Sequence, residues 1–513
     1  MKTNSLKDKM TLHPIMTLIL LIGLTIVISG FLSLIGMQAV QYKINTNTLE
    51  YSTELLKVES LFSFSGLKYI FSSTVANFVA FTPLSSLIII LIGIGVMEKS
   101  GFLKTSLSLI TKRMKKNTVT FIIVFISVIS SFMGDLSYVI MIPISALIFQ
   151  YGKRNPIIGI IASFAGLTCG SGLSFLITSI DSSLISTTIL GAKILDPGFR
   201  FATTSFLFIM FLSILILSIT ITIITERYLI YKLDKYEAPE TDIEELKTTR
   251  EEVRGLIFST FAGIIYIVFF IYQIIPGLPF SGNLLDQSQT FYIDKLFSYN
   301  SFFSNGFVFV VTMFFVILGF FYGIGAKTIK NNKDFVDTLG HSLDGIGKAL
   351  VLIFFASTFI SIFRYTNIGN IIVAQLTNLI TGLKFTGIPL IVLLFLVAAI
   401  STFFVPSSLS KWTILAPTIV PTFMNAGITP QFTQLIFRFG ECVTMGLTPL
   451  MAYFVIYLAM LDKFNPSEKP ISLFKSLKYQ ISYSLICGGI LLIILIVWYV
   501  IGLPIGIKGS SIL

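Results

Sequence analysis

The sequence is poor in charge and in the side chains that most often perform chemistry. Only 12% of its 513 residues are charged, about half the share of a typical soluble domain. Its three cysteines, Cys169, Cys442 and Cys487, all lie in apolar sequence and form no disulfide or zinc pattern. Its two histidines, His13 and His341, lie at the ends of apolar segments without a partner motif. We therefore expect no metal site and no cofactor.

Motifs for nucleotide binding and nucleophilic catalysis are also absent. The sequence contains no P-loop, no Walker lysine and no recognisable pair of a nucleophile and a base. Its net charge of +11 comes without a soluble basic face, so we expect no nucleic-acid partner. An excess of lysine and arginine in cytoplasmic loops accounts for the charge. An enzyme is not expected, and a channel or membrane enzyme is the least favoured alternative.

Apolar residues dominate the chain. They make up 54% of it, and the mean hydropathy is +0.89. Several apolar runs reach the roughly 20 residues that cross a bilayer as a helix, and they are too long for barrel strands. We predict an all-α polytopic protein of the cytoplasmic membrane, with the N-terminus inside and the C-terminus outside. The nine predicted spans are 14–35, 83–97, 156–192, 203–224, 256–275, 306–324, 345–363, 431–461 and 481–501.

Two further apolar stretches are interrupted by polar residues. The interruption in one of them contains Pro406, Ser407, Ser408, Ser410, Lys411 and Trp412, and that in the other contains Gly134, Asp135 and Ser137. Lipid does not tolerate exposed non-helical backbone, so each break must face protein or a wet cavity. We predict re-entrant helical hairpins at about 118–151 and about 386–425, with both tips lining a substrate site.

Two of the predicted spans are too long for one simple helix and have broken middles. One contains Gly172 among other glycines and hydroxyl residues; the other begins at Pro430 and is interrupted near Gly446 and Pro449. The order span, hairpin, broken span, span thus occurs twice, with opposite orientation, which is typical of the inverted repeats of secondary transporters. The halves are residues 1–233 and 255–513, joined by a charged cytoplasmic connector at 234–254.

Four motifs together resemble one family of carriers. They are Gly134-Asp135-Leu136-Ser137-Tyr138 with Ile142-Pro143; residues 166–181; Pro406-Ser407 with Ser410-Lys411-Trp412 and Ala416-Pro417; and Arg438-Phe439-Gly440-Glu441 with Thr448-Pro449-Leu450. With nearly the whole chain, they are similar to the p-aminobenzoyl-glutamate transporter (AbgT) family of the elevator-like ion-transporter superfamily. The resemblance implies a homodimer with an inward-facing core built from both hairpins and both broken helices.

The sequence departs from the family pattern at two positions. Leu409 stands where the hairpin tip usually has a serine, and Glu441 stands where an aspartate is usual. The first departure weakens the inference that the family substrate is bound in an identical way. The second keeps the charge on a longer arm.

Charged residues at membrane depth are the best candidates for coupling and binding. We expect Asp181 to be the coupling carboxylate, with a local cap or ion pair as the alternative. Arg438 and Glu441, three residues apart on one helical face, either form a structural ion pair or let the arginine hold an anionic substrate. Asp135 either binds a cation or pairs with a lysine. Glu441 and Asp135 are the further candidates for a coupling group.

The second tip supplies the expected substrate contacts. Its serines and backbone meet helix N-termini, which favour carboxylates. Lys411, Arg438, Gly134, Ser137 and Gly172 are assigned to the same site. We expect Trp412 to stack on an aromatic ring of the substrate, with an interfacial anchor as the alternative. Pro406, Pro430, Pro449 and Gly446 are expected to shape the breaks.

These expectations favour a secondary active transporter, coupled to the proton motive force. The resemblance implies p-aminobenzoyl-glutamate uptake, or export of sulfonamide antimetabolites by an antiporter that confers sulfonamide resistance. The alternative is a sodium-coupled dicarboxylate or amino-acid carrier of the same superfamily. Sodium sites there use tips of the Ser-Asn-Thr type, and neither tip contains an asparagine.

Overall fold

The computed structural model describes residues 12–45, 49–173, 179–202, 204–233, 236, 249–290, 292–297, 301–302, 306–465 and 469–513. The first half contains α2 (Pro14–Leu34), β1 (Gln38–Ile44), β2 (Tyr51–Lys57), α3 (Phe64–Val79), α4 (Thr82–Lys99), α5 (Phe102–Arg113), α6 (Lys116–Ile129), η1 (Ser130–Met133), α7 (Leu136–Tyr151), α8 (Pro156–Cys169), α9 (Ser179–Lys193), α10 (Leu207–Ile224), η2 (Thr225–Leu229) and α11 (Ile230–Lys232). The second half contains α12 (Arg250–Ile274), α13 (Tyr292–Phe297), α15 (Phe307–Gly325), α16 (Asn332–His341), α17 (Gly347–Tyr365), α18 (Ile368–Leu383), α19 (Gly387–Phe404), α20 (Ser408–Asn425), α21 (Pro430–Met445), α22 (Phe454–Lys463) and α23 (Leu473–Ile501). Most of the predicted connector lies outside the described residues.

Nine helical segments of the described chain are long and apolar enough to cross a bilayer. The number of spans matches the sequence prediction, but the segments that make up the nine are not the same. The nine include 116–133 and 387–404, the first arms of the two predicted hairpins, and they omit both broken crossings. The reason is length, because a broken crossing yields two halves that are each shorter than a bilayer is thick.

Helices α6 and α7 form a hairpin whose open ends lie together. The side chain of Arg154, which follows α7, donates to the backbone oxygen of Lys116 (3.1 Å) and to Thr120 Oγ1 (2.8 Å) at the start of α6. It also forms an ion pair of 2.7 Å with Glu226 of η2, and both side chains of this pair are largely buried. One guanidinium thus joins both ends of the hairpin to the end of α10.

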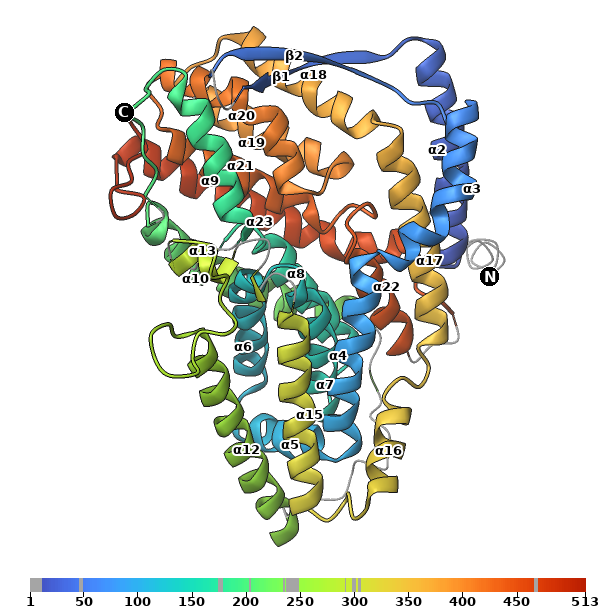
Figure 1. Ribbon diagram of the computed structural model, residues 1–513. Helices are drawn as coiled ribbons and strands as arrows, with labels where there is room; N and C mark the ends of the chain where they lie inside the picture. The colour runs from blue at the N-terminus through green and yellow to red at the C-terminus, as the bar shows by residue number, and fades with distance from the viewer. Residues whose placement is uncertain are drawn as a thin grey trace.

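The hairpins and the broken helices pack in a reciprocal pattern. The first hairpin lies against α8, and α7 also contacts α22, the second half of the other broken helix. The second hairpin, α19 and α20, lies against α21, and α20 also packs along α9, the second half of the first broken helix. In Figure 1, α9, α19, α20 and α21 gather in the upper part of the molecule, while α6 and α7 lie below them.

One pair of strands departs from the all-helical prediction, and one helix was not predicted. Residues between the first two predicted spans form the antiparallel pair β1 and β2, which runs over α18 and α20 at the top of Figure 1. Tyr51 of β2 donates a hydrogen bond to the carbonyl of Pro417 (3.1 Å), an oxygen left without its helical partner because Pro421 has no N–H. Helix α18 was also missed, although Ile368, Ile371 and other buried apolar residues recur along one of its faces.

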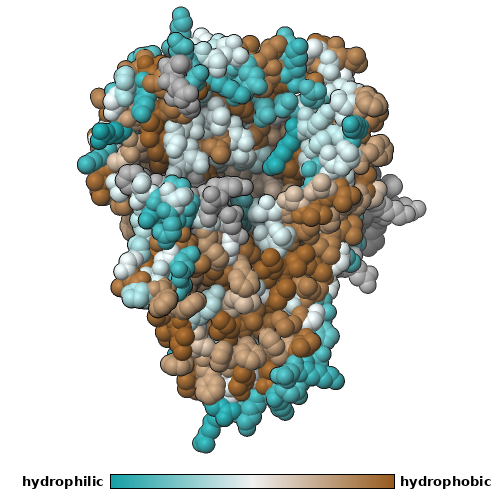
Figure 2. Space-filling view, in the orientation of Figure 1, coloured by the Kyte–Doolittle hydropathy of each residue, from teal (hydrophilic) through white to brown (hydrophobic). Residues whose placement is uncertain are grey.

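The surface is apolar where a membrane would surround it. Figure 2 shows brown side chains over the lower half of this face and teal ones at its bottom tip and along its upper rim. Phe261 and Phe269 of α12 are 66% and 59% exposed. Faces of this kind suit contact with lipid chains.

Replacing Arg154 with alanine is expected to destabilise the protein. It leaves the mostly buried Glu226 without its cation, which typically costs about 3–5 kcal/mol. The melting temperature of the purified protein in detergent should therefore fall clearly. The exposed neighbour Lys153 is the control, and Lys153→Ala should melt like the wild type; equal melting of the two variants would contradict the assigned role of Arg154.

Candidate functional site

Both hairpin tips are formed by residues that stop one helix and start the next. Helix α19 ends at Phe404, two residues before Pro406, whose ring disfavours helix in the residue before it. Ser407 then caps α20, because its hydroxyl oxygen accepts from the backbone N–H of Ser410 (3.3 Å). At the first tip Gly134 has a φ of +57°, a conformation that favours glycine. The sequence therefore fixes where each tip turns.

The breaks in the two long crossings lie against each other. A Cβ on Gly172, just after α8, would lie 2.5 Å from the backbone oxygen of Arg438 in α21, so only glycine fits this approach. The N–H of Gly172 donates to Cys442 Sγ (3.0 Å). Gly446, which follows the last residue of α21, lies in turn against the side chain of Thr168 near the end of α8. Pro430 occupies the first turn of α21.

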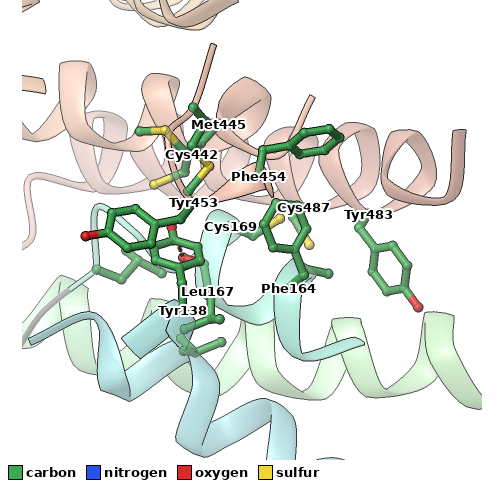
Figure 3. Close-up of a cluster of buried hydrophobic side chains, with 14 of the residues drawn as sticks. Tyr138, Phe164, Leu167, Cys169, Cys442, Met445, Tyr453, Phe454, Tyr483 and Cys487 are labelled. Atoms are coloured by element: carbon green, nitrogen blue, oxygen red, sulfur yellow. Dashed lines mark hydrogen bonds between the residues drawn. The ribbon is translucent and has the colours of Figure 1, made fainter. Parts of the chain in front are cut away.

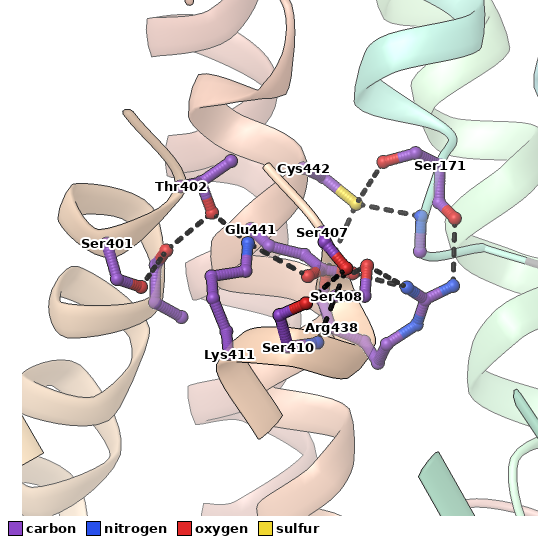
Figure 4. A network of polar contacts seen from close by, with 12 residues as sticks. Ser171, Ser401, Thr402, Ser407, Ser408, Ser410, Lys411, Arg438, Glu441 and Cys442 are labelled. Atoms are coloured by element: carbon purple, nitrogen blue, oxygen red, sulfur yellow. Dashed lines mark hydrogen bonds and ion pairs between the residues drawn. The ribbon is translucent and has the colours of Figure 1, made fainter. Parts of the chain in front are cut away.

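Glu441 of α21 is the centre of a buried polar network (Figure 4). Its carboxylate is fully buried, and one oxygen accepts from Ser408 Oγ (2.8 Å) and from Arg438 Nη1. The other oxygen lies 3.2 Å from Lys411 Nζ without hydrogen-bond geometry. Lys411, also fully buried, donates to Thr402 Oγ1 of α19 (2.5 Å). The network thus connects α19, α20 and α21.

Arg438 extends the network to the other broken helix. Its guanidinium donates to the backbone oxygen of Ser171 (2.9 Å) and lies 3.4 Å from a carboxylate oxygen of Asp181 in α9. Its side chain is 6% exposed, and that of Asp181 is 19% exposed. With Lys411 and Glu441, the group contains two positive and two negative charges, so it is neutral as a whole. Such mutual pairing is what allows charges to be buried at membrane depth.

A cavity of about 280 Å³ opens between the two tips, and we call it the tip cavity. The predicted site residues that line it are Gly134, Asp135, Ser137, Pro406, Ser407, Ser408 and Arg438. The cavity therefore brings together two stretches that are more than 250 residues apart in the chain. Asp135 is exposed there, and no lysine lies within ion-pair distance of it in the described part of the chain.

Several predicted contacts lie outside the tip cavity. Ser410 lines an adjoining space, whereas Lys411, Trp412, Gly172, Asp181, Glu441, Pro430, Pro449 and Gly446 line neither space. Asp181 and Glu441 form ion pairs with Arg438, which lines the tip cavity, and Gly172 lies against the backbone of the same residue. Lys411 is closed off by its own partners, Glu441 and Thr402.

Trp412 differs from both sequence expectations. Its ring is fully buried, so it neither faces an open site nor anchors at an interface. It stacks on Phe437 with ring centroids 4.6 Å apart, and its Nε1 donates to Thr188 Oγ1 (2.8 Å). Thr188 donates in turn to Gln434 Oε1 (2.6 Å). In this conformation Trp412 joins α20 to α9 and α21.

Aromatic side chains form a layer, and Figure 3 shows Tyr138, Phe164, Tyr453 and Phe454 of this layer. Tyr138 of the first hairpin stacks on Tyr453 at 5.5 Å, and Phe164 of α8 stacks on Tyr457 of α22 at 4.2 Å. Tyr138 and Tyr453 both line the tip cavity. The apolar wall that this layer provides is typical of a site for a small organic molecule.

Sequence reasoning missed Arg364, near the end of α17. Its side chain lines both the tip cavity and the adjoining space. An arginine near the end of an apolar span is usually an interfacial charge, so its position alone does not indicate a site. The available signal was that this arginine follows a predicted span and precedes the second predicted hairpin, without any acidic residue close to it in sequence.

These features define a class of protein: a multi-pass membrane transporter with a charge-paired interior beside a cavity between helix breaks. The chain belongs to the AbgT family, because the family model described as "AbgT putative transporter family" matches residues 5–513. The p-aminobenzoyl-glutamate transport protein of Escherichia coli K12 is 28% identical over 495 residues, which are 96% of this chain and 93% of that protein.

Two solved structures are also similar. The YdaH transporter of Alcanivorax borkumensis is 25% identical, with a TM-score of 0.48 over 97% of this chain and 100% of that one. MtrF of Neisseria gonorrhoeae, described as illuminating a class of antimetabolite efflux pumps, is 26% identical, with a TM-score of 0.49 over 98% of both chains.

The buried charges should behave as a unit. Lys411→Met leaves Glu441 with one cation, and Glu441→Gln leaves a buried lysine without an anion, so each change should lower stability by several kcal/mol. The double variant keeps the Arg438–Asp181 pair and remains neutral. Its loss in unfolding free energy should be smaller than the sum of the single losses by about 1–3 kcal/mol.

Chemical denaturation of the three variants in detergent measures this coupling. Thr413→Val is a suitable control, because Thr413 lies in the same helix, is exposed and bonds only its own backbone. Strict additivity of the Lys411 and Glu441 changes would show that the two charges are independent.

Proposed function

We propose that this protein is a secondary active transporter of p-aminobenzoyl-glutamate-like or sulfonamide-like small molecules, driven by the proton gradient across the cytoplasmic membrane. The observation that carries the proposal is the placement of Arg438. One guanidinium lines the tip cavity and also contacts the carboxylates of Asp181 and Glu441. A ligand in the cavity and a proton on a carboxylate therefore act on the same cation.

Asp181 is the proposed coupling group. Its contact with Arg438 is the longest ion pair in the network, at 3.4 Å, and it is the more exposed of the two carboxylates. Protonation of Asp181 removes one negative charge beside Arg438. The electrostatic potential in the tip cavity then becomes more positive, which favours an anionic substrate. Proton and substrate binding are then linked through one coupling free energy.

The hairpins are proposed to be re-entrant and the two halves to form an inverted repeat. The reciprocal packing supports this, since each hairpin lies on its own broken helix and on the far half of the other. The proposed moving core, in an elevator-like cycle, is this set of hairpins and broken helices. The protein is further proposed to form a homodimer, with the N-terminus inside and the C-terminus outside. Native mass spectrometry in detergent tests the dimer.

Asp181→Asn is expected to abolish flux driven by a proton gradient in proteoliposomes. The amide keeps the shape of the side chain but cannot release a proton at neutral pH. Exchange of labelled for unlabelled substrate, which needs no net proton movement, should persist. Wild-type gradient-driven flux from this variant would refute the coupling role.

Asp196→Asn is the matched control, because Asp196 lies just after α9, is exposed and caps only its local turn through the N–H of Gly198. It should transport like the wild type. Replacing sodium by choline should leave transport unchanged; a loss of transport without sodium would favour the sodium-coupled carrier instead.

A further inference from the structure

Arg364 is a cation beside the tip cavity whose side chain has no partner among the described residues. It lies in the last turn of α17 and is exposed. Its side chain has no ion pair and no hydrogen bond to any residue that the structure describes. Arg438, the other arginine of the tip cavity, is by contrast engaged by two carboxylates and a backbone oxygen. The guanidinium of Arg364 is therefore more available to a ligand than that of Arg438.

Arg364 stands where two spaces join. Beside the tip cavity lies a second space of about 280 Å³, the side chamber. The residues that line both are Arg364, Pro406, Ser407 and Leu450. Because one water molecule occupies about 30 Å³ of liquid volume, the side chamber has room for a short arm of a substrate whose body lies in the tip cavity.

The side chamber also contains neutral hydrogen-bond donors. Ser407 Oγ accepts from the N–H and from the hydroxyl of Ser410 (3.3 and 2.9 Å), which leaves its own proton free to donate. The amide groups of Asn367 and Asn370 line the same space. No acidic side chain lines the side chamber among the described residues. A cation with nearby neutral donors and no anion is the composition of a carboxylate site.

We propose that Arg364 and Ser407 form a second carboxylate subsite, which holds an acidic arm of the substrate in the side chamber. This inference rests on the proposed transport function and deepens it. Arg364 then selects carboxylate-bearing substrates over neutral ones that share the same ring. Helix α17 packs mainly on α2 and α3, whereas Ser407 belongs to the second hairpin tip. The subsite therefore spans two separately packed groups of helices.

The test compares binding of two ligands of similar shape by purified wild-type and variant protein. The ligands are p-aminobenzoyl-glutamate and its diamide, which lacks both negative charges. Arg364→Gln should weaken p-aminobenzoyl-glutamate by roughly tenfold or more, as expected for a lost charge-assisted hydrogen bond, and leave diamide binding within about twofold. Arg364→Lys should recover part of the loss, because it restores the charge without the planar fork.

The controls separate binding from folding. Lys384→Gln removes an exposed cation that lines neither space and should change neither ligand. If Arg364 had only a structural role, Arg364→Gln would lower the melting temperature and weaken the binding of both ligands alike. That result would overturn the subsite. Equal binding of p-aminobenzoyl-glutamate by wild type and Arg364→Gln overturns it too.

The result also distinguishes this inference from the proposed function. A wild-type protein that binds the diamide and sulfanilamide but no carboxylate overturns the subsite and leaves transport of neutral molecules standing. A wild-type protein that binds none of these ligands overturns both.

Discussion

The structure around the cavity depends on four largely buried charges that neutralise one another. Removing a single ion from water costs several kcal/mol even after the protein relaxes. Ion pairing offsets this cost among the four side chains, which are Arg438, Glu441, Lys411 and Asp181. Ser408 and Thr402 add hydrogen bonds to Glu441 and Lys411. Glu441 and Arg438 each lie between two opposite charges, so displacing either one breaks two ion pairs at once. The network therefore holds α9, α19, α20 and α21 in one arrangement.

Helix breaks make this network possible. Gly172 lets the first broken crossing approach α21 closely enough for Ser171 to offer its backbone oxygen to Arg438. Ser407 starts α20 so that Ser408 lies beside Glu441. In a continuous helix these backbone groups would be satisfied internally and closed to side chains. The breaks give up helical hydrogen bonds locally and provide polar groups where the charges need them.

Much of this was visible in the sequence, for a clear physical reason. Bilayer thickness imposes run lengths, and proline, glycine and serine clusters mark interruptions, so the hairpin arms and the breaks could be predicted. The pairing of Arg438 with Glu441 was one of two alternatives that their spacing left open. The strands β1 and β2 and helix α18 were missed because their patterns are short and amphipathic. The burial of Trp412 depends on Phe437 and Thr188, which reach it through tertiary packing. The role of Arg364 likewise depends on where α17 ends in space.

The proposed transport cycle gains from the neutrality of the interior. A core that moves across the membrane with a net buried charge would carry an electrical and desolvation penalty with it. Here the four paired side chains have no net charge when the site is empty. An added proton makes the net charge positive, and an added carboxylate makes it negative. One carboxylate of the substrate and a proton on Asp181 compensate each other, so the paired charges around Arg438 are balanced again. Arg364 is exposed and does not belong to the four paired charges. In the proposed subsite it can therefore bind a substrate carboxylate without breaking any of their ion pairs.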